Sequence, residues 1–289
     1  MKISEIVAQK KLCLSMEVFP PKKQDALSSV VATAEEISSL KPDFISITYG
    51  AGGTTRSNTL ELSQKIERTG TPALSHLTCV GNTKESVKAA IEDLKKAGIH
   101  NVLALRGDMP QDGTPLSKDL QHASDLIPLL KAEGFCVGGA CYPEGHPESL
   151  NRIDDIENMK HKVDAGVDFL TTQMFFDNNM LYSYLYRLEA MGIHVPVFAG
   201  IMPITNSSQV SRMVKLSSAY IPSKLLSICD RFENNPEAMY QAGIAYAVDQ
   251  IIDLISNGVK GIHIYTMNKP NVAKDIVSRI DAIVEATNK

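Results

Sequence analysis

The sequence predicts a closed (β/α)8 barrel, because eight short β-type runs alternate with helix-length amphipathic segments along the chain. The runs are apolar on both faces, which is typical of parallel strands that helices cover. Eight such units in 289 residues fit a closed barrel better than the alternative, an open doubly wound sheet. The expected strands are Leu14–Phe19, Phe44–Tyr49, Ala73–Cys79, Asn101–Leu105, Cys136–Tyr142, Phe169–Phe175, Val195–Met202 and Gly261–Met267.

Small and polar residues mark the ends of the intervening helices. Thr83 is expected to cap the N-terminus of one helix, and Gly98 is expected to end it in the left-handed conformation. The same helix–glycine–strand step recurs at Gly166, Gly192 and Gly258. The expected helices are Ala26–Leu40, Ser57–Arg68, Thr83–Ala97, Leu120–Ala132, Ile153–Ala165, Leu181–Met191, Gln209–Leu216, Pro236–Ile255 and Val272–Ala286.

The interval between the seventh and eighth strands is longer than the others. It has room for an inserted helix pair that includes Pro222–Arg231. No linker or shift in composition marks a second domain. We therefore expect one α/β domain over residues 1–289, a TIM barrel with extra helices between strands 7 and 8.

The composition narrows the class of protein. Apolar residues make up 44% and charged residues 21% of the chain, which is an ordinary globular balance. A net charge of −4 argues against a nucleic-acid partner, and no apolar run is long enough to predict a membrane helix. The five cysteines form no CxxC pair, and Cys79, Cys136 and Cys141 stand in apolar runs typical of buried thiols. We expect a reduced, cytoplasmic protein.

Polar side chains gather at the carboxyl ends of the expected strands, where a parallel barrel has its active site. The clearest case is Glu17, which interrupts an apolar strand just before Pro20 and Pro21. An apolar pocket raises the pKa of a carboxyl group toward the range that is useful for donating a proton. Glu17 is therefore a candidate general acid. The alternative is that Glu17 pairs with an arginine or lysine across the barrel.

Two loops carry weaker signals. Asp108 follows Arg106 and Gly107, and this glycine allows another group to approach the backbone closely. Alternatively, Asp108 is an N-cap or turn residue. The segment 50–53 lies where a phosphate-binding loop would lie, but it lacks the third glycine of GxGxxG, so a tight turn is favoured.

Three histidines, His76, His146 and His263, stand on different strands or strand ends. They leave a three-histidine metal site open, although no HxH or HxxE spacing supports it. The residues by themselves therefore indicate a barrel enzyme that acts on a polar, anionic or cofactor-sized ligand, and they do not name the reaction.

Six ordered segments resemble methylenetetrahydrofolate reductase, and with Gly200–Pro203 the similarity runs from Ser15 to Lys269. The resemblance implies the short, bacterial-type catalytic chain, without the regulatory domain of longer family members. The six segments are Met16–Lys22, Ile47–Ala51, His76–Cys79, Ala104–Asp108, Tyr142–Pro147 and Thr172–Asp177.

The resemblance also implies an activity in one-carbon metabolism and methionine biosynthesis. Such an enzyme carries FAD, which takes a hydride from NADH or NADPH and passes it to 5,10-methylenetetrahydrofolate in ping-pong fashion. The product is 5-methyltetrahydrofolate. Folate and a nicotinamide nucleotide would be its small-molecule partners, and a homo-oligomer is expected. The alternatives are another flavin- or nicotinamide-dependent barrel oxidoreductase and a non-catalytic partner subunit of the same family.

Residue roles follow from the same resemblance. Glu17 would be the general acid that protonates the folate imidazolidine ring, and Asp108 would lie near flavin and folate, where its charge favours a cationic iminium ion. The substrate-binding residues would be Thr48, Gln173, Gln209 and Lys269. The FAD-binding residues would be Tyr49, Ala51, His76, Arg106, Gly107, Asp108, His122, Tyr142, His146, Asp155, Asn158, His161 and Lys162, and no metal is expected.

Four positions depart from the family pattern. His161 and Lys269 stand where arginines are expected. The charge of His161 depends on pH, and Lys269 offers a point charge in place of the bidentate guanidinium of an arginine. Met213 replaces an expected phenylalanine, and His122 replaces an expected tyrosine. These departures bear on affinity and nucleotide preference more than on the reaction.

Overall fold

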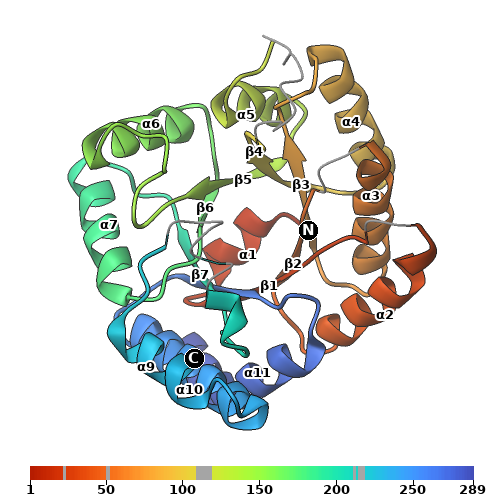
Figure 1. The fold of residues 1–289 in the computed structure, drawn as a ribbon. Coiled ribbons are helices and arrows are strands. Elements are labelled where there is room, and N and C mark those ends of the chain that lie inside the picture. The colour runs from red at the N-terminus through yellow and green to blue at the C-terminus, as the bar shows by residue number, and fades with distance from the viewer. Residues whose placement is uncertain (22–23, 50–52, 109–118, 211–212, 214–218) are drawn as a thin grey trace.

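The computed structural model is a closed barrel of eight parallel strands in the order β1-β2-β3-β4-β5-β6-β7-β8, as predicted (Figure 1). It describes the chain except residues 22–23, 50–52, 109–118, 211–212 and 214–218. The strands are β1 (Cys13–Val18), β2 (Phe44–Ile47), β3 (Ala73–Thr78), β4 (Asn101–Leu105), β5 (Cys136–Cys141), β6 (Phe169–Thr172), β7 (Val197–Ile201) and β8 (Gly261–Tyr265). Several strands end earlier than predicted. Because β6 ends at Thr172, Gln173 lies just beyond it.

The helices surround the barrel (Figure 1). Thr83 accepts a hydrogen bond from the Ser86 amide as the predicted cap, and the φ angles of Gly98, Gly166, Gly192 and Gly258 are all positive. The predicted insertion between β7 and β8 is confirmed by α9 and α10. The bounds are α2 (Leu27–Ser38), α3 (Gly53–Arg68), α4 (Lys84–Lys96), α5 (Ala123–Ala132), α6 (Arg152–Asp164), α7 (Asn178–Ala190), α9 (Ser223–Phe232), α10 (Pro236–Ser256) and α11 (Pro270–Asn288), with a 3-10 turn at Gln24–Ala26.

The predicted helix Gln209–Leu216 falls largely outside the described residues. None of the described helices is long and apolar enough to cross a bilayer. All five cysteines are buried with free thiols, as predicted for Cys79, Cys136 and Cys141. Burial raises the pKa of the Cys141 thiol to about 12, so this thiol stays protonated at neutral pH.

A short helix that the sequence analysis did not predict, α1 (Ile3–Gln9), lies across one end of the barrel (Figure 1). Its buried residue Ile3 packs with Phe44, Phe169 and Phe198 from the barrel interior. The amide of Ile3 donates a 2.8 Å hydrogen bond to Oδ1 of Asn101, at the start of β4. The amino-terminal end of the barrel is therefore filled, which leaves the carboxyl-terminal end for a ligand.

The interior changes from apolar to polar along the strands. Phe198 contacts Phe44 and Phe169, with ring centroids 5.2 Å and 5.5 Å apart, and these rings fill the amino-terminal part. A methyl group on Gly138 or Gly261 would lie within 2.8 Å of a phenylalanine ring, so glycine is required at both positions. Alternate residues of a strand share a face, so the next inward positions toward the carboxyl end carry the polar groups described below.

Candidate active site

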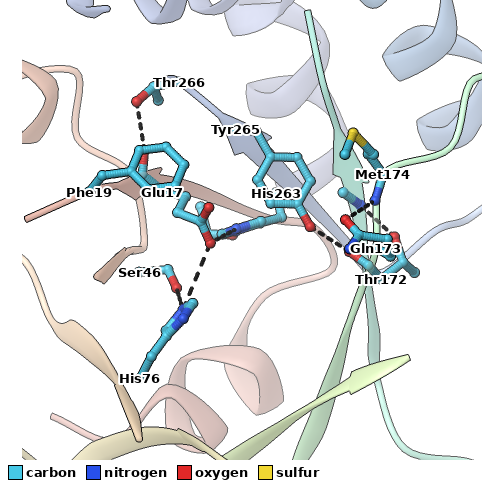
Figure 2. Close-up of polar contacts among 12 residues, drawn as sticks. Glu17, Phe19, Ser46, His76, Thr172, Gln173, Met174, His263, Tyr265 and Thr266 are labelled. Carbon is cyan, nitrogen blue, oxygen red and sulfur yellow. Dashed lines mark hydrogen bonds and ion pairs between the residues drawn. The ribbon is translucent and has the colours of Figure 1, made fainter. Parts of the chain in front are cut away.

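Three strands bring one carboxyl group and two imidazoles together inside the barrel. Glu17 of β1 lies between His76 of β3 and His263 of β8 (Figure 2). Its Oε2 atom is 3.8 Å from Nε2 of His76 and 3.7 Å from Nε2 of His263. The side chains of Glu17, His76 and His263 are only 9%, 6% and 1% exposed. The cluster is therefore almost fully shielded by protein.

Each of the two imidazoles is within hydrogen-bond distance of a serine hydroxyl. Ser46 Oγ lies 2.5 Å from Nε2 of His76, and Ser15 Oγ lies 2.8 Å from Nδ1 of His263. Burial lowers the pKa of His76 to about 4, because desolvation outweighs the attraction of Glu17. His76 is therefore neutral at physiological pH.

Among the described residues, no lysine or arginine forms an ion pair with Glu17. The ion-pair partners of Glu17 in the described ranges are His76 and His263. The third histidine of the metal hypothesis, His146, stacks edge-on against Tyr142 with ring centroids 4.6 Å apart. In the part of the chain that the structure describes, no three or more His, Cys, Asp or Glu side chains are arranged so that they could hold a metal ion.

Next to this cluster, Tyr265 of β8 crosses to the end of β6 (Figure 2). Its hydroxyl donates a 2.6 Å hydrogen bond to the Thr172 carbonyl, and its ring stands edge-on to His263. Gly200 makes room, since a methyl group there would lie 2.5 Å from the same carbonyl and 2.8 Å from the Tyr265 ring. Gln173 follows directly, and its Oε1 atom accepts a hydrogen bond from the Met174 amide.

The ends of β4 and β5 form a second group at the barrel rim. Arg106 forms a bidentate ion pair with Glu148, and the Nη2–Oε1 distance is 2.7 Å. The hydrogen bond raises the pKa of Arg106 and lowers the pKa of Glu148. Gly107 has a φ of +89°, and a methyl group there would lie 3.0 Å from Thr78. Asp108 is exposed beside this group.

Helix α6 contributes the buried Asp155, the half-buried Lys162 and two exposed residues. Asp155 accepts hydrogen bonds from the His146 amide at 3.0 Å and from Ser149 Oγ at 3.2 Å, and so shapes the loop after β5. Lys162 donates a 2.5 Å hydrogen bond to the Ala140 carbonyl, and burial lowers its pKa. Asn158 and His161 are exposed.

Comparison with known proteins decides the family. Residues 2–281 match the family described as methylenetetrahydrofolate reductase. The 5,10-methylenetetrahydrofolate reductase of Pectobacterium carotovorum is 36% identical over 267 residues, which cover 92% of this chain and 89% of that protein. The chain belongs to the methylenetetrahydrofolate reductase family. Methylenetetrahydrofolate reductase (NADH) 1 of Zea mays is 32% identical over 99% of this chain, which spans 51% of the maize protein.

Solved structures support the fold of this methylenetetrahydrofolate reductase family member. A Clostridium thermocellum protein, described as binding two copies of 5-methyl-5,6,7,8-tetrahydrofolic acid, aligns with a TM-score of 0.67 at 14% identity. The alignment covers 99% of this chain and 100% of that chain. At this identity the similarity shows the barrel fold alone.

The structure disperses some residues that the family resemblance selects. The Tyr49 side chain packs against the main core and lines a small pocket with Thr59, Leu94 and His76. Gln209 uses Oε1 to accept hydrogen bonds from the Thr205 and Asn206 amides. Thr48 is half-buried, Met213 is buried, and Lys269 and His122 are exposed, with His122 at the start of α5. Ala51 lies outside the described residues.

Sequence reasoning missed several supports of the reductase-family site. Ser15, Ser46 and Tyr265 received no role, and His263 entered only as a metal candidate. A signal was present, because Ser15 lies two positions before Glu17 and His263 two before Tyr265. The alternation of a strand places such residues on the same inward face. The pairing of Ser15 with His263 requires the β1–β8 register, which the sequence does not display.

Proposed function

We propose that this chain is a flavin-dependent methylenetetrahydrofolate reductase that converts 5,10-methylenetetrahydrofolate to 5-methyltetrahydrofolate with electrons from NADH or NADPH. The observation that carries the proposal is Glu17, a buried carboxyl group flanked by two imidazoles at the ligand end of a family-matched barrel. The single domain over residues 1–289 would hold every residue that the reaction needs.

The rim residues fit FAD. The guanidinium group of Arg106 already binds one anion, the Glu148 carboxylate, through two hydrogen bonds. A phosphate group can accept the same pair of hydrogen bonds from an arginine. FAD would supply reversible hydride storage between the nicotinamide and the folate. The residues that would hold it are His76, Arg106, Gly107, Asp108, His122, Tyr142, His146, Asp155, Asn158, His161 and Lys162, with Tyr49 and Ala51 from the loop after β2.

Glu17 would carry the proton that opens the folate ring. The acid form donates from its carboxyl oxygen to an imidazolidine nitrogen, the C–N bond breaks, and the substrate becomes a cationic iminium ion. Shielding by protein keeps bulk water from competing for this proton. Asp108, at the rim, would stabilise the cation by its negative charge.

Thr48, Gln173, Gln209 and Lys269 would bind the substrates. Gln173 supports this role, because its Oε1 atom is held by the Met174 amide, which leaves the side-chain NH2 to donate to a ligand. Lys269 is exposed and would offer a point charge to an anionic group of folate. Folate and nicotinamide would use the site in turn, which gives ping-pong kinetics. The cytoplasmic location and the homo-oligomer stay predictions. Light scattering of the purified protein would check the oligomeric state.

The test separates the two half-reactions under anaerobic conditions. Wild-type protein with bound FAD should be reduced by NADH or NADPH and reoxidised by methylenetetrahydrofolate. Glu17→Gln should retain reduction and lose reoxidation by about 10²–10⁴-fold, the range of general acid catalysis. Glu92→Gln, on the exposed face of α4, is the matched control and should behave as wild type.

The alternatives give different results. If methylenetetrahydrofolate leaves reduced wild-type flavin unchanged, the reductase proposal is wrong, and another flavin-dependent oxidoreductase with the same barrel is favoured. If Glu17→Gln loses both half-reactions while FAD stays bound, the proton-donor role is wrong.

A further inference from the structure

The segment that follows β8 holds the backbone around Glu17. Thr266 Oγ1 donates a 2.6 Å hydrogen bond to the Glu17 carbonyl (Figure 2). Asn268 forms two hydrogen bonds with the backbone of Phe19, which lies two residues after Glu17. Its Oδ1 atom accepts from the Phe19 amide at 2.8 Å, and its Nδ2 atom donates to the Phe19 carbonyl at 2.9 Å.

These bonds begin where the strand pairing stops. The ladder between β1 and β8 ends at the pair Glu17 and Tyr265. Beyond that pair, Asn268 offers one acceptor and one donor to Phe19, as a neighbouring strand would. On the other side of β1, the Thr48 amide donates to the Val18 carbonyl at 3.2 Å. The backbone from Glu17 to Phe19 is therefore fixed from both sides.

The connection adopts an unusual conformation to make these contacts. Met267 and Asn268 have φ angles of +54° and +55°, which few residues other than glycine adopt. Asparagine tolerates this region better than most residues, and methionine does not. Two hydrogen bonds close the turn. The Asn268 amide donates to Thr266 Oγ1 at 3.2 Å, and the Lys269 amide donates to the Thr266 carbonyl at 3.0 Å. The surrounding hydrogen bonds therefore impose the shape.

We propose that Thr266 and Asn268 are positioning residues for Glu17, and that they couple it to Lys269. This inference rests on the proposed function. An acid that is misplaced by about 1 Å can lose about 10²-fold in rate, so fixing the backbone of Glu17 fixes the origin of the proton. Lys269 follows Asn268 directly in the chain. Binding of a folate anion by Lys269 and donation of the proton by Glu17 would thus both depend on the conformation of this turn.

A pair of substitutions at one site tests the hydrogen bond itself. Thr266→Val keeps the shape and removes the hydroxyl, while Thr266→Ser keeps the hydroxyl. In the holoenzyme, Thr266→Val and Asn268→Ala should each slow flavin reoxidation by methylenetetrahydrofolate at least tenfold and change flavin reduction by NADH less than twofold. Thr266→Ser should stay within about threefold of wild type. Asn271→Ala, which loses only an exposed contact to Tyr240, is the control.

A second readout excludes a merely structural role. The pH profile of the reoxidation rate should move in Thr266→Val and in Asn268→Ala, and it should return to the wild-type profile in Thr266→Ser. Bound flavin and the thermal midpoint are measured in the same samples. Equal losses in both half-reactions, or loss in Thr266→Ser as well, would overturn the positioning role.

The outcomes separate this inference from the proposed function. Reoxidation that is intact in wild type and undiminished in both variants overturns the inference and leaves the reductase standing. Wild-type flavin that folate fails to reoxidise overturns the reductase and the inference together.

Discussion

The Nε2 atom of His263 lies 3.7 Å from Oε2 of Glu17, is fully buried, and has no hydrogen-bond partner in the ranges that the structure describes. When Ser15 donates its single hydroxyl proton to the Ile262 carbonyl, which lies 3.3 Å away, Nδ1 of His263 is the donor to Ser15. The lone pair of Nε2 then faces Glu17. It can accept a hydrogen bond from a carboxylic acid, whereas a carboxylate has no proton to offer.

His263→Phe should therefore weaken the proton donor. We expect reoxidation of reduced flavin by methylenetetrahydrofolate to slow by about 10–100-fold, because the acceptor that orients the Glu17 acid is removed. Reduction by NADH should change less than twofold, and rapid-mixing absorbance measurements would separate the two rates. His194→Phe, at an exposed histidine, should leave both unchanged. Equal slowing of both rates would contradict the assignment.

His76 should make stability depend on pH. In the folded protein its pKa is lowered to about 4 by burial, whereas in the unfolded chain it is 6.5. Between these values the unfolded state binds the proton and the folded state does not, so stability falls as pH falls through this window. The contribution is about 3 kcal/mol when fully lost.

Urea unfolding of wild type and His76→Gln, in the same flavin state at pH 7.5 and at pH 4.5, would measure this contribution. Glu17 and His263 face His76 and are present in both proteins, so the difference between the two proteins isolates His76. The loss of stability on acidification should be smaller in His76→Gln by about 2 kcal/mol or more. His194→Gln should lose as much unfolding free energy between pH 7.5 and pH 4.5 as wild type does. If His76→Gln also loses as much as wild type, the assignment to His76 is wrong.

The fold was predictable because its signal is distributed along the whole chain. Each strand run and each glycine after a helix is a local feature, and errors at strand ends do not change the strand order. Helix α1 was missed because its seven residues are too few to show a clear period. Its role depends on Phe44, Phe169 and Phe198, which are distant in sequence.

The site was predictable only in part. Glu17 stood out because a carboxylate inside an apolar run is costly unless something satisfies it. Its partners His76 and His263 reach it through strand pairing, and the Arg106–Glu148 pair joins two loops. Such contacts depend on register and loop shape, which one sequence does not encode locally. The family pattern selects Lys162 but does not reveal that its amine donates a hydrogen bond to the Ala140 carbonyl.

Gly200 should tolerate no side chain. In Gly200→Ala the new methyl group would lie 2.5 Å from the Thr172 carbonyl and 2.8 Å from Tyr265, so the tyrosine must move away from its hydrogen bond. We expect a loss of about 1–3 kcal/mol in unfolding free energy from overpacking. Tyr265→Phe removes the hydrogen bond alone and should cost about 1 kcal/mol. Denaturant unfolding would rank the two, and equal stability of Gly200→Ala and wild type would show that the Tyr265 position is not fixed.

Glu148 should compete with FAD for Arg106. The carboxylate occupies the guanidinium fork through two hydrogen bonds, at a rim position where the Glu148 side chain is 57% exposed. A diphosphate that binds Arg106 must displace it and also meets its negative charge. Exposed ion pairs contribute at most about 1 kcal/mol, so Glu148→Gln should lower the Kd for FAD by about two- to fivefold.

Fluorescence titration of the flavin-free protein with FAD would measure this change, and raising the salt concentration should reduce it because exposed charges are screened. Glu133→Gln, in the exposed pair with Lys95, is the matched control and should leave the Kd unchanged. Arg106→Gln should raise it. Weaker FAD binding by Glu148→Gln would mean that Glu148 orients Arg106 toward the phosphates instead of occupying their place.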